Sequence, residues 1–128
     1  MDNPSLLSPS VLAFVGDAVY GLYVRTYLAE VNRPSSELHR LSVKLVNATA
    51  QANAYRLIES KLSAKELSVF KRGRNFHTGN TPKNSTGGEY HLATGLETLF
   101  GFLYLSGEND RAKQLFDIIW NNTLGTLK

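Results

Sequence analysis

Cysteine is absent from the sequence, and its absence excludes several kinds of site at once. Without a thiol the chain can form no disulfide bond, no thiolate metal site and no cysteine nucleophile. The three histidines, His39, His77 and His91, do not fall into an HExxH or similar array, so a zinc site is not expected either. A chain without disulfides is typical of the reducing interior of the cell.

Long apolar runs are also missing. The best candidate, residues 12–28, is interrupted by Asp17 and Arg25 and falls short of the roughly 18 consecutive apolar residues of a membrane span. The N-terminal MDNPSLLSPS lacks the basic start and apolar run of a signal peptide. We therefore expect a cytoplasmic protein with no membrane partner.

Acidic residues are missing from the stretch between Glu66 and Glu89. The formal net charge of the whole chain is only +3, so its positive charge is concentrated in this stretch. A local basic patch favours a phosphate-bearing partner more than a diffuse excess would. The basic residues of the stretch are Lys71, Arg72, Arg74 and Lys83.

The hydrophobic pattern predicts helices and no convincing strand. Ser8 and Pro9 can cap and start a first helix, and the segment SAKE that begins at Ser63 matches a capping box. Breaks at 31–34 and 106–107, a bend near Asn47 and a Gly- and Pro-containing loop at 75–88 divide the chain into several helices. With 128 residues we expect one all-α domain over 1–128, its core at about 8–122. On the first helix, the residues expected to face the core are Leu12, Val15, Val19 and Leu22.

Two acids lie inside otherwise apolar predicted helices, Asp17 in LAFVGDAVYGLYVRTYL and Glu97 in HLATGLETLFGFLYL. An ionised carboxylate buried without a partner is costly, so each acid needs a cation, a charged partner or an open cleft. Each has alanine four positions before it, an aromatic residue three after and glycine four after, which are neighbours on a helix. Such small neighbours would let another backbone, an ion or a phosphate approach. Two carboxylates on packed helices would suit Mg²⁺.

Plainer interpretations stand beside this one. A lone acid in a helix is usually at the surface or paired, and Arg25 or Arg56 could be its partner. The segment KRGRNFHTGNTPKN offers Arg side chains and backbone N–H groups suited to phosphate oxygens, with Phe76 as a stacking surface. The same composition also fits a solvated surface loop.

Three segments resemble known motifs. FVGDAVY resembles the L-G-D-A-V signature of ribonuclease III catalytic domains, which carries a catalytic aspartate on a helix. GLETLFGFLYLSG is similar to their second motif, E-A-L-I-G-x-x-Y-L, whose glutamate is the other main metal ligand. KRGRNFHTGNTPKN resembles the K-R-G-R-N-x-x-S/T-G-x-T-P-K-N segment of the Mini-ribonuclease III family, the compact bacterial relatives without a double-stranded-RNA-binding domain. The resemblance covers residues 12–107, and the few residues after Trp120 leave no room for such a domain.

This resemblance implies a homodimeric, all-α bundle of the ribonuclease III catalytic-domain type, with two active sites along a cleft that the dimer forms. It also implies Mg²⁺-dependent cleavage of double-stranded RNA, with Mn²⁺ as an alternative ion, and a role in the maturation of ribosomal RNA, here the 23S precursor. Asp17 and Glu97 would be the catalytic and metal-binding residues. The residues that would contact RNA are Lys71, Arg72, Arg74, Asn75 and Lys83.

The chain departs from full-length ribonucleases III at three accessory acids. Ala13 and Ser10 stand where those enzymes carry acids before the aspartate, and Thr94 stands where they carry an aspartate before the glutamate. Mini-ribonucleases III generally lack these acids too, so the departures fit that family. The number of metal ions per site stays open.

The leading hypothesis is therefore an endoribonuclease. The alternative is a catalytically silent RNA-binding scaffold of the same fold, against which the retention of both Asp17 and Glu97 argues. A third hypothesis is a helical dimerisation domain whose basic loop serves solubility.

Overall fold

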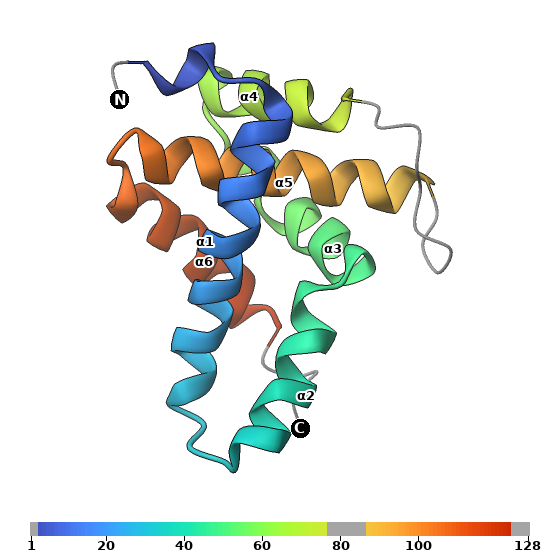
Figure 1. The fold of residues 1–128 in the computed structure, drawn as a ribbon, viewed down its shortest axis with the longest axis vertical. Helices are drawn as coiled ribbons and strands as arrows, with labels where there is room; N and C mark the ends of the chain where they lie inside the picture. Colours follow the sequence, from blue (N-terminus) through green and yellow to red (C-terminus); the bar gives the residue numbers. More distant parts are fainter. Residues whose placement is uncertain (1–2, 77–86, 124–128) are drawn as a thin grey trace.

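The computed structural model describes residues 3–76 and 87–123, and these residues form helices and no strand. This confirms the predicted all-α class. None of the described helices is long and apolar enough to cross a membrane. The α-helices are α1 (Pro9–Ala29), α2 (Ser35–Val46), α3 (Ala48–Ile58), α4 (Ala64–Arg74), α5 (Gly87–Leu105) and α6 (Asn109–Asn121), with short 3-10 turns η1 (Pro4–Leu6) and η2 (Glu59–Lys61) (Figure 1).

Local side-chain signals set the helix ends, as predicted. The Ser8 hydroxyl accepts a hydrogen bond from the Val11 N–H at 3.2 Å, which caps α1. Ser63 and Glu66 form the reciprocal capping box of α4. The bend expected near Asn47 is a complete break, because the Asn47 side chain accepts from the Ala50 N–H at 2.8 Å and so caps a new helix, α3.

Helix α5 is the centre of the fold. Helix α1 crosses it in Figure 1, and α3, α4 and α6 also pack against it. A helix covered on so many sides must be apolar almost all round, which explains why HLATGLETLFGFLYL shows so little amphipathic periodicity. Its most deeply buried side chains, all with 0% exposure, are Leu96, Thr98, Leu99, Phe100 and Leu103.

Helix α4, which carries the basic residues, is fastened to α6 by a buried ion pair. The Arg111 guanidinium donates to both carboxylate oxygens of Glu66, at 2.8 and 2.9 Å. Arg111 and the burial of Glu66 have opposite effects, and the Arg111 hydrogen bonds prevail and lower the pKa of Glu66. Because Arg111 also donates to the Lys61 carbonyl at 2.7 Å, it orients the start of α4.

One part of the predicted α1 face is wrong. Leu12 and Val19 are buried as expected and Val15 is half-buried, but the side chain of Leu22 is 66% exposed. The helices that pack against α1, among them α2, α4 and α5, leave the side with Leu22 uncovered. On this side lies what we call the α1 stripe, a row of exposed apolar residues at helical spacing: Val11, Phe14, Ala18 and Leu22.

Candidate active site

The site begins at the crossing of α1 and α5, where two glycines bring the helices into backbone contact. A Cβ atom on Gly16 would overlap the carbonyl oxygen of Glu97, and one on Gly101 would overlap the carbonyl oxygen of Leu12. Small residues beside each acid were expected to let another backbone, an ion or a phosphate approach, and at Gly101 it is a backbone that does so. At Gly21 the space is open, since a Cβ there would meet nothing within 4 Å, and on α1 the backbone contact falls at Gly16 instead.

The aromatic residues that follow the two acids also meet at this crossing. Tyr20 and Phe100 pack edge to face, with ring centroids 5.3 Å apart. Each ring lies three residues after its acid, so one contact fixes the rotation of both helices. Asp17 and Glu97 have similar neighbours in the sequence because the two segments pack against each other at the same helix crossing.

This crossing puts the two carboxyl groups within hydrogen-bonding reach of each other. Glu97 is half-buried and Asp17 is exposed, and a side-chain hydrogen bond joins them. Burial, the negative charge of Asp17 and this hydrogen bond raise the pKa of Glu97 to about 8. Glu97 therefore keeps a proton near neutral pH, and a cation that replaced this proton would stabilise the ionised pair.

Neither acid has a basic partner within the described residues. The alternative that Arg25 or Arg56 neutralises one of them is therefore not what this part of the chain displays. The ion pairs among the described residues are Arg33–Glu37, Arg40–Glu37, Arg111–Glu66 and Lys113–Asp117.

An amide that we did not identify from the sequence completes the site. Gln51 of α3 is only 2% exposed, and its amide opposes the rise of the Glu97 pKa. The one available signal was a glutamine at a core-facing position of ATAQANAY, between positions filled by alanine and tyrosine.

The donor set fits Mg²⁺. This ion is usually held by one or two carboxylates together with waters and substrate phosphates. Asp17 and Glu97 are such a pair, and no group of three or more potential ligands from His, Asp and Glu occurs within residues 3–76 and 87–123. The hydroxyl of Thr94 donates to the Tyr90 carbonyl at 3.0 Å inside α5, so it is occupied by its own helix.

The basic residues of α4 divide into two groups. Lys71 and Asn75 are exposed, and the partly exposed Arg74 donates to the Asn75 side chain at 3.1 Å. Arg74 and Asn75 line an open hollow of about 480 Å³ together with Arg56 and His91. The acid Glu89 also lines this hollow, so the hollow carries two arginines and one carboxyl group. Lys83 lies outside the described residues.

Arg72 differs from the others because its guanidinium is directed into the molecule. It donates to the carbonyl oxygens of Ser5 at 3.0 Å and Leu7 at 2.9 Å, and so holds η1 against α4. These are charge-assisted bonds to backbone acceptors that otherwise have no helical partner. The prediction that Arg72 contacts RNA stays a prediction, and its geometry favours a structural role.

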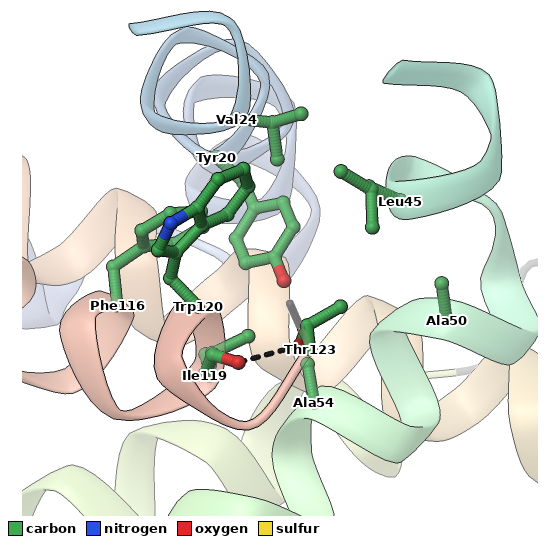
Figure 2. Close-up of a pocket in the computed structure, with 9 residues that line it drawn as sticks. All are labelled: Tyr20, Val24, Leu45, Ala50, Ala54, Phe116, Ile119, Trp120 and Thr123. Carbon is green, nitrogen blue, oxygen red and sulfur yellow. Dashed lines mark hydrogen bonds between the residues drawn. The ribbon is translucent and has the colours of Figure 1, made fainter. Parts of the chain in front are cut away.

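A second cavity is too small to bind a substrate. It has a volume of about 30 Å³, and Figure 2 shows residues of α1, α2, α3 and α6 around it, with Tyr20 among them. Burial, with a smaller effect from the charge of Glu97, raises the pKa of Tyr20 far above its usual value. Tyr20 is thus a neutral phenol of the core, and the accessible chemistry lies at Asp17 and Glu97.

Comparison with known proteins identifies the family of this chain. Residues 10–108 match the family described as Ribonuclease III domain. The Mini-ribonuclease 3 of Thermoanaerobacter sp. (strain X514) is 47% identical over 113 residues, which cover 88% of this chain and 80% of that protein. The Mini-ribonuclease 3 of Staphylococcus aureus (strain NCTC 8325 / PS 47) is 35% identical over 127 residues, 93% of this chain and 95% of that protein.

A solved structure shares the fold. The crystal structure of a Fusobacterium nucleatum protein superposes with a TM-score of 0.83 at 30% sequence identity and covers 91% of this chain and 94% of that one. Relatives this similar, matched over most of both chains, establish the family that the three motifs suggested. The chain therefore belongs to the ribonuclease III family, together with the proteins named Mini-ribonuclease 3, and it is an endoribonuclease.

Proposed function

We propose that this endoribonuclease uses Mg²⁺, held by Asp17 and Glu97, to hydrolyse phosphodiesters of double-stranded RNA as a homodimer. The observation that carries the proposal is the pair of hydrogen-bonded carboxyl groups at the α1–α5 crossing, which has no cationic partner among the described residues. Membership of the family is the basis for double-stranded RNA as the substrate, and the two carboxyl groups are the basis for a metal-dependent hydrolysis.

The two acids have different tasks because their environments differ. The half-buried Glu97, held between α1 and α3, is suited to fixing the ion in one place. The exposed Asp17 is suited to orienting a water molecule and accepting its proton. When bound, Mg²⁺ supplies a Lewis acid that lowers the pKa of an attacking water and stabilises charge on the leaving oxygen.

RNA would be held through its backbone. Lys71, Arg74 and Asn75 present cationic and amide groups at the surface of α4, and the hollow beside them adds Arg56. Lys83 would add a further charge. Duplex RNA is recognised mainly through its shape, its phosphates and its 2′-hydroxyls, so we expect limited sequence preference and an affinity that falls steeply with salt.

The α1 stripe supports the homodimer. Phe14 is 80% exposed, Leu22 66% and Val11 45%, and they lie on the helix that carries Asp17. A row of exposed apolar residues on a core helix indicates an interaction surface. Pairing of this surface with its own copy would place two active sites along one face of the dimer, as the family's cleft requires.

Within the cell, the proposed substrate is a base-paired segment of a ribosomal RNA precursor, the 23S precursor in particular, and the site of action is the cytoplasm. The family resemblance alone supports this assignment. Cleavage of a transcript carrying the paired flanks of the 23S precursor, with the product ends mapped against those of mature RNA, tests it.

The central experiment is cleavage of a defined RNA duplex by the wild type, Asp17→Asn and Glu97→Gln with Mg²⁺ titrated. Both variants should keep their helical circular-dichroism spectrum and their affinity for RNA, and cleavage should fall by at least a hundredfold. Wild-type cleavage by both variants, with unchanged metal dependence, would falsify the proposed site. RNA binding by the wild type without cleavage at any Mg²⁺ concentration would favour a silent scaffold instead.

A further inference from the structure

Two arginines line the hollow between α3, α4 and the start of α5. Arg56 comes from α3 and Arg74 from the last turn of α4, and both helices pack against α5 (Figure 1). Neither guanidinium takes part in an ion pair within residues 3–76 and 87–123. Glu89 is the one acid among the described residues that line the hollow, so two positive charges stand against one negative charge. The hollow therefore has an excess of positive charge.

Neutral amide groups orient both guanidinium groups. Arg56 donates through Nη1 to the Oδ1 atom of Asn53 at 2.8 Å, and Arg74 donates through Nε to the Oδ1 atom of Asn75 at 3.1 Å. A guanidinium has five N–H donors, so one bond to a neutral acceptor leaves its charge and most of its donors available for an anion. The planar fork of an arginine matches the oxygens of a phosphate, which makes a phosphate group the expected ligand.

The hollow lies a short way along α5 from the acid pair. Its lining residues on α5 fall between Gly88 and Leu92, which precede Glu97 by nine and five residues in the same helix. A rise of about 1.5 Å per residue makes this about 8–14 Å along the helix axis. Such a separation corresponds to a few nucleotides along an RNA strand. A duplex with its scissile phosphate at Asp17 and Glu97 would therefore have another backbone phosphate within reach of the hollow, whose volume of about 480 Å³ admits one.

We infer that this hollow is a subsite for one phosphodiester of the substrate RNA, a few nucleotides from the bond that is cut, and that Arg56 and Arg74 bind it from two sides. Arg56 is the new residue in this assignment, because it lies on α3, outside the basic segment that begins at Lys71. A phosphate held at a fixed distance from the acids would set the position of the cut. The inference deepens the proposed function and rests on it, because it assumes that Asp17 and Glu97 cleave the RNA.

The decisive variant is Arg56→Gln, which removes the charge of an exposed side chain and should leave the fold intact. Arg40→Gln is the matched control, because Arg40 is an exposed arginine of α2 that does not line the hollow. Binding of an RNA duplex is measured first, with a chelator present to prevent cleavage. We expect Arg56→Gln to bind about tenfold more weakly and to lower the slope of log affinity against log salt by about one. Arg40→Gln should behave as the wild type.

Cleavage of modified duplexes then locates the contact. In a series of substrates, each carries one uncharged methylphosphonate in place of a single phosphodiester. For the wild type and Arg40→Gln, the replacement should raise KM about tenfold at one position a few nucleotides from the cut. Arg56→Gln should show a raised KM with every substrate, the wild-type Mg²⁺ requirement, and little further response at that position. Two changes that remove the same contact are not additive, so this loss of response identifies the phosphate that Arg56 binds.

The outcomes separate the inference from the function on which it rests. A wild-type KM and RNA affinity in Arg56→Gln would overturn the subsite and leave the proposed function intact. The same holds if every methylphosphonate raised KM by the same factor in the wild type and in Arg56→Gln, because Arg56 would then contact no particular phosphate. An equal loss of affinity in Arg56→Gln and Arg40→Gln would also overturn it, as an effect of net charge alone. Absence of cleavage by the wild type at any Mg²⁺ concentration would remove the proposed function itself.

Discussion

Glu97 and Asp17 share a hydrogen bond across the α1–α5 crossing, and this bond needs a proton on one of the two carboxyl groups. Burial and the Asp17 charge raise the pKa of Glu97 to about 8, so the pair retains that proton at neutral pH. At the proposed metal site, binding of a metal ion would therefore compete with binding of this proton.

The first prediction concerns this competition. Because a cation must displace the shared proton, the affinity for Mg²⁺ should increase as the pH rises from about 6 to 9 and level off above the Glu97 pKa of about 8. Calorimetric titration in two buffers of different ionisation enthalpy would report close to one proton released per site at pH 7 and almost none at pH 9. An affinity independent of pH would contradict the shared proton.

The second prediction concerns the stability of the metal-free protein. An acid with a raised native pKa keeps its proton in the folded state while the unfolded chain has lost it. The pair should therefore lower the free energy of unfolding progressively between about pH 4.5 and pH 8. Glu97→Gln removes both the burial of an ionised carboxylate and its repulsion by Asp17, so it should stabilise the protein by on the order of 2 kcal/mol at pH 9, and by little at pH 4.5.

Urea denaturation with a chelator present measures this effect at both pH values. Asp17→Asn is the matched variant: it removes the Asp17 charge but leaves Glu97 buried, so it should produce a smaller gain with the same sign of pH dependence. If both variants were destabilising at pH 9, the two acids would have to be separated in solution rather than hydrogen-bonded.

Several features of the fold could be predicted from the sequence because their causes are local. Ser8 with Pro9, and Ser63 with Glu66, satisfy backbone groups within one turn, so the chain itself carries the signal. The two acids were also predictable, since a single carboxylate in an apolar helix needs a compensating group wherever that helix packs.

Other features depend on which surfaces meet, and no local pattern contains that information. Gly16 rather than Gly21 lies at the helix crossing because α1 meets α5 at the turn before Tyr20. Leu22 is at the correct spacing for the core and lies 66% exposed, because only one side of α1 is covered. In the sequence, Arg72 cannot be distinguished from the basic residues beside it. Its structural role arises because η1 lies against α4 and places two carbonyl groups within reach of the guanidinium.

The third prediction tests the helix crossing. Gly16→Ala would place a methyl group against the Glu97 carbonyl, so it should destabilise the protein by about 1–3 kcal/mol and lower cleavage by separating the acids. Gly21→Ala is the control on the same helix, with open space around its Cβ, and should stabilise by about 0.5–1 kcal/mol. Urea denaturation and duplex cleavage would measure both. Equal behaviour of the two variants would contradict the backbone contact.

The fourth prediction separates the basic residues of α4. Arg72→Ala removes the two hydrogen bonds to Ser5 and Leu7 and should lower the free energy of unfolding by about 1–3 kcal/mol. Lys71→Ala should change stability by less than about 0.5 kcal/mol. It should weaken RNA binding and lower the slope of log affinity against log salt by about one. Filter binding over a range of salt concentrations supplies the comparison. Unchanged RNA affinity in Lys71→Ala and Arg74→Ala together would remove α4 from the RNA-binding surface.

The fifth prediction concerns the α1 stripe and the proposed homodimer. Phe14 is 80% exposed, and burying such a side chain in an interface contributes about 2 kcal/mol. A two-fold interface contains it twice, so Phe14→Glu should weaken association by about 4 kcal/mol, roughly a thousandfold in dissociation constant.

Val43→Glu on α2 is the control, because Val43 is 50% exposed and lies outside the stripe. In sedimentation at micromolar concentration, the wild type and Val43→Glu should be dimers, and Phe14→Glu should be a helical monomer. A monomeric wild type would exclude the two-site cleft, and a dimeric Phe14→Glu would move the interface away from α1.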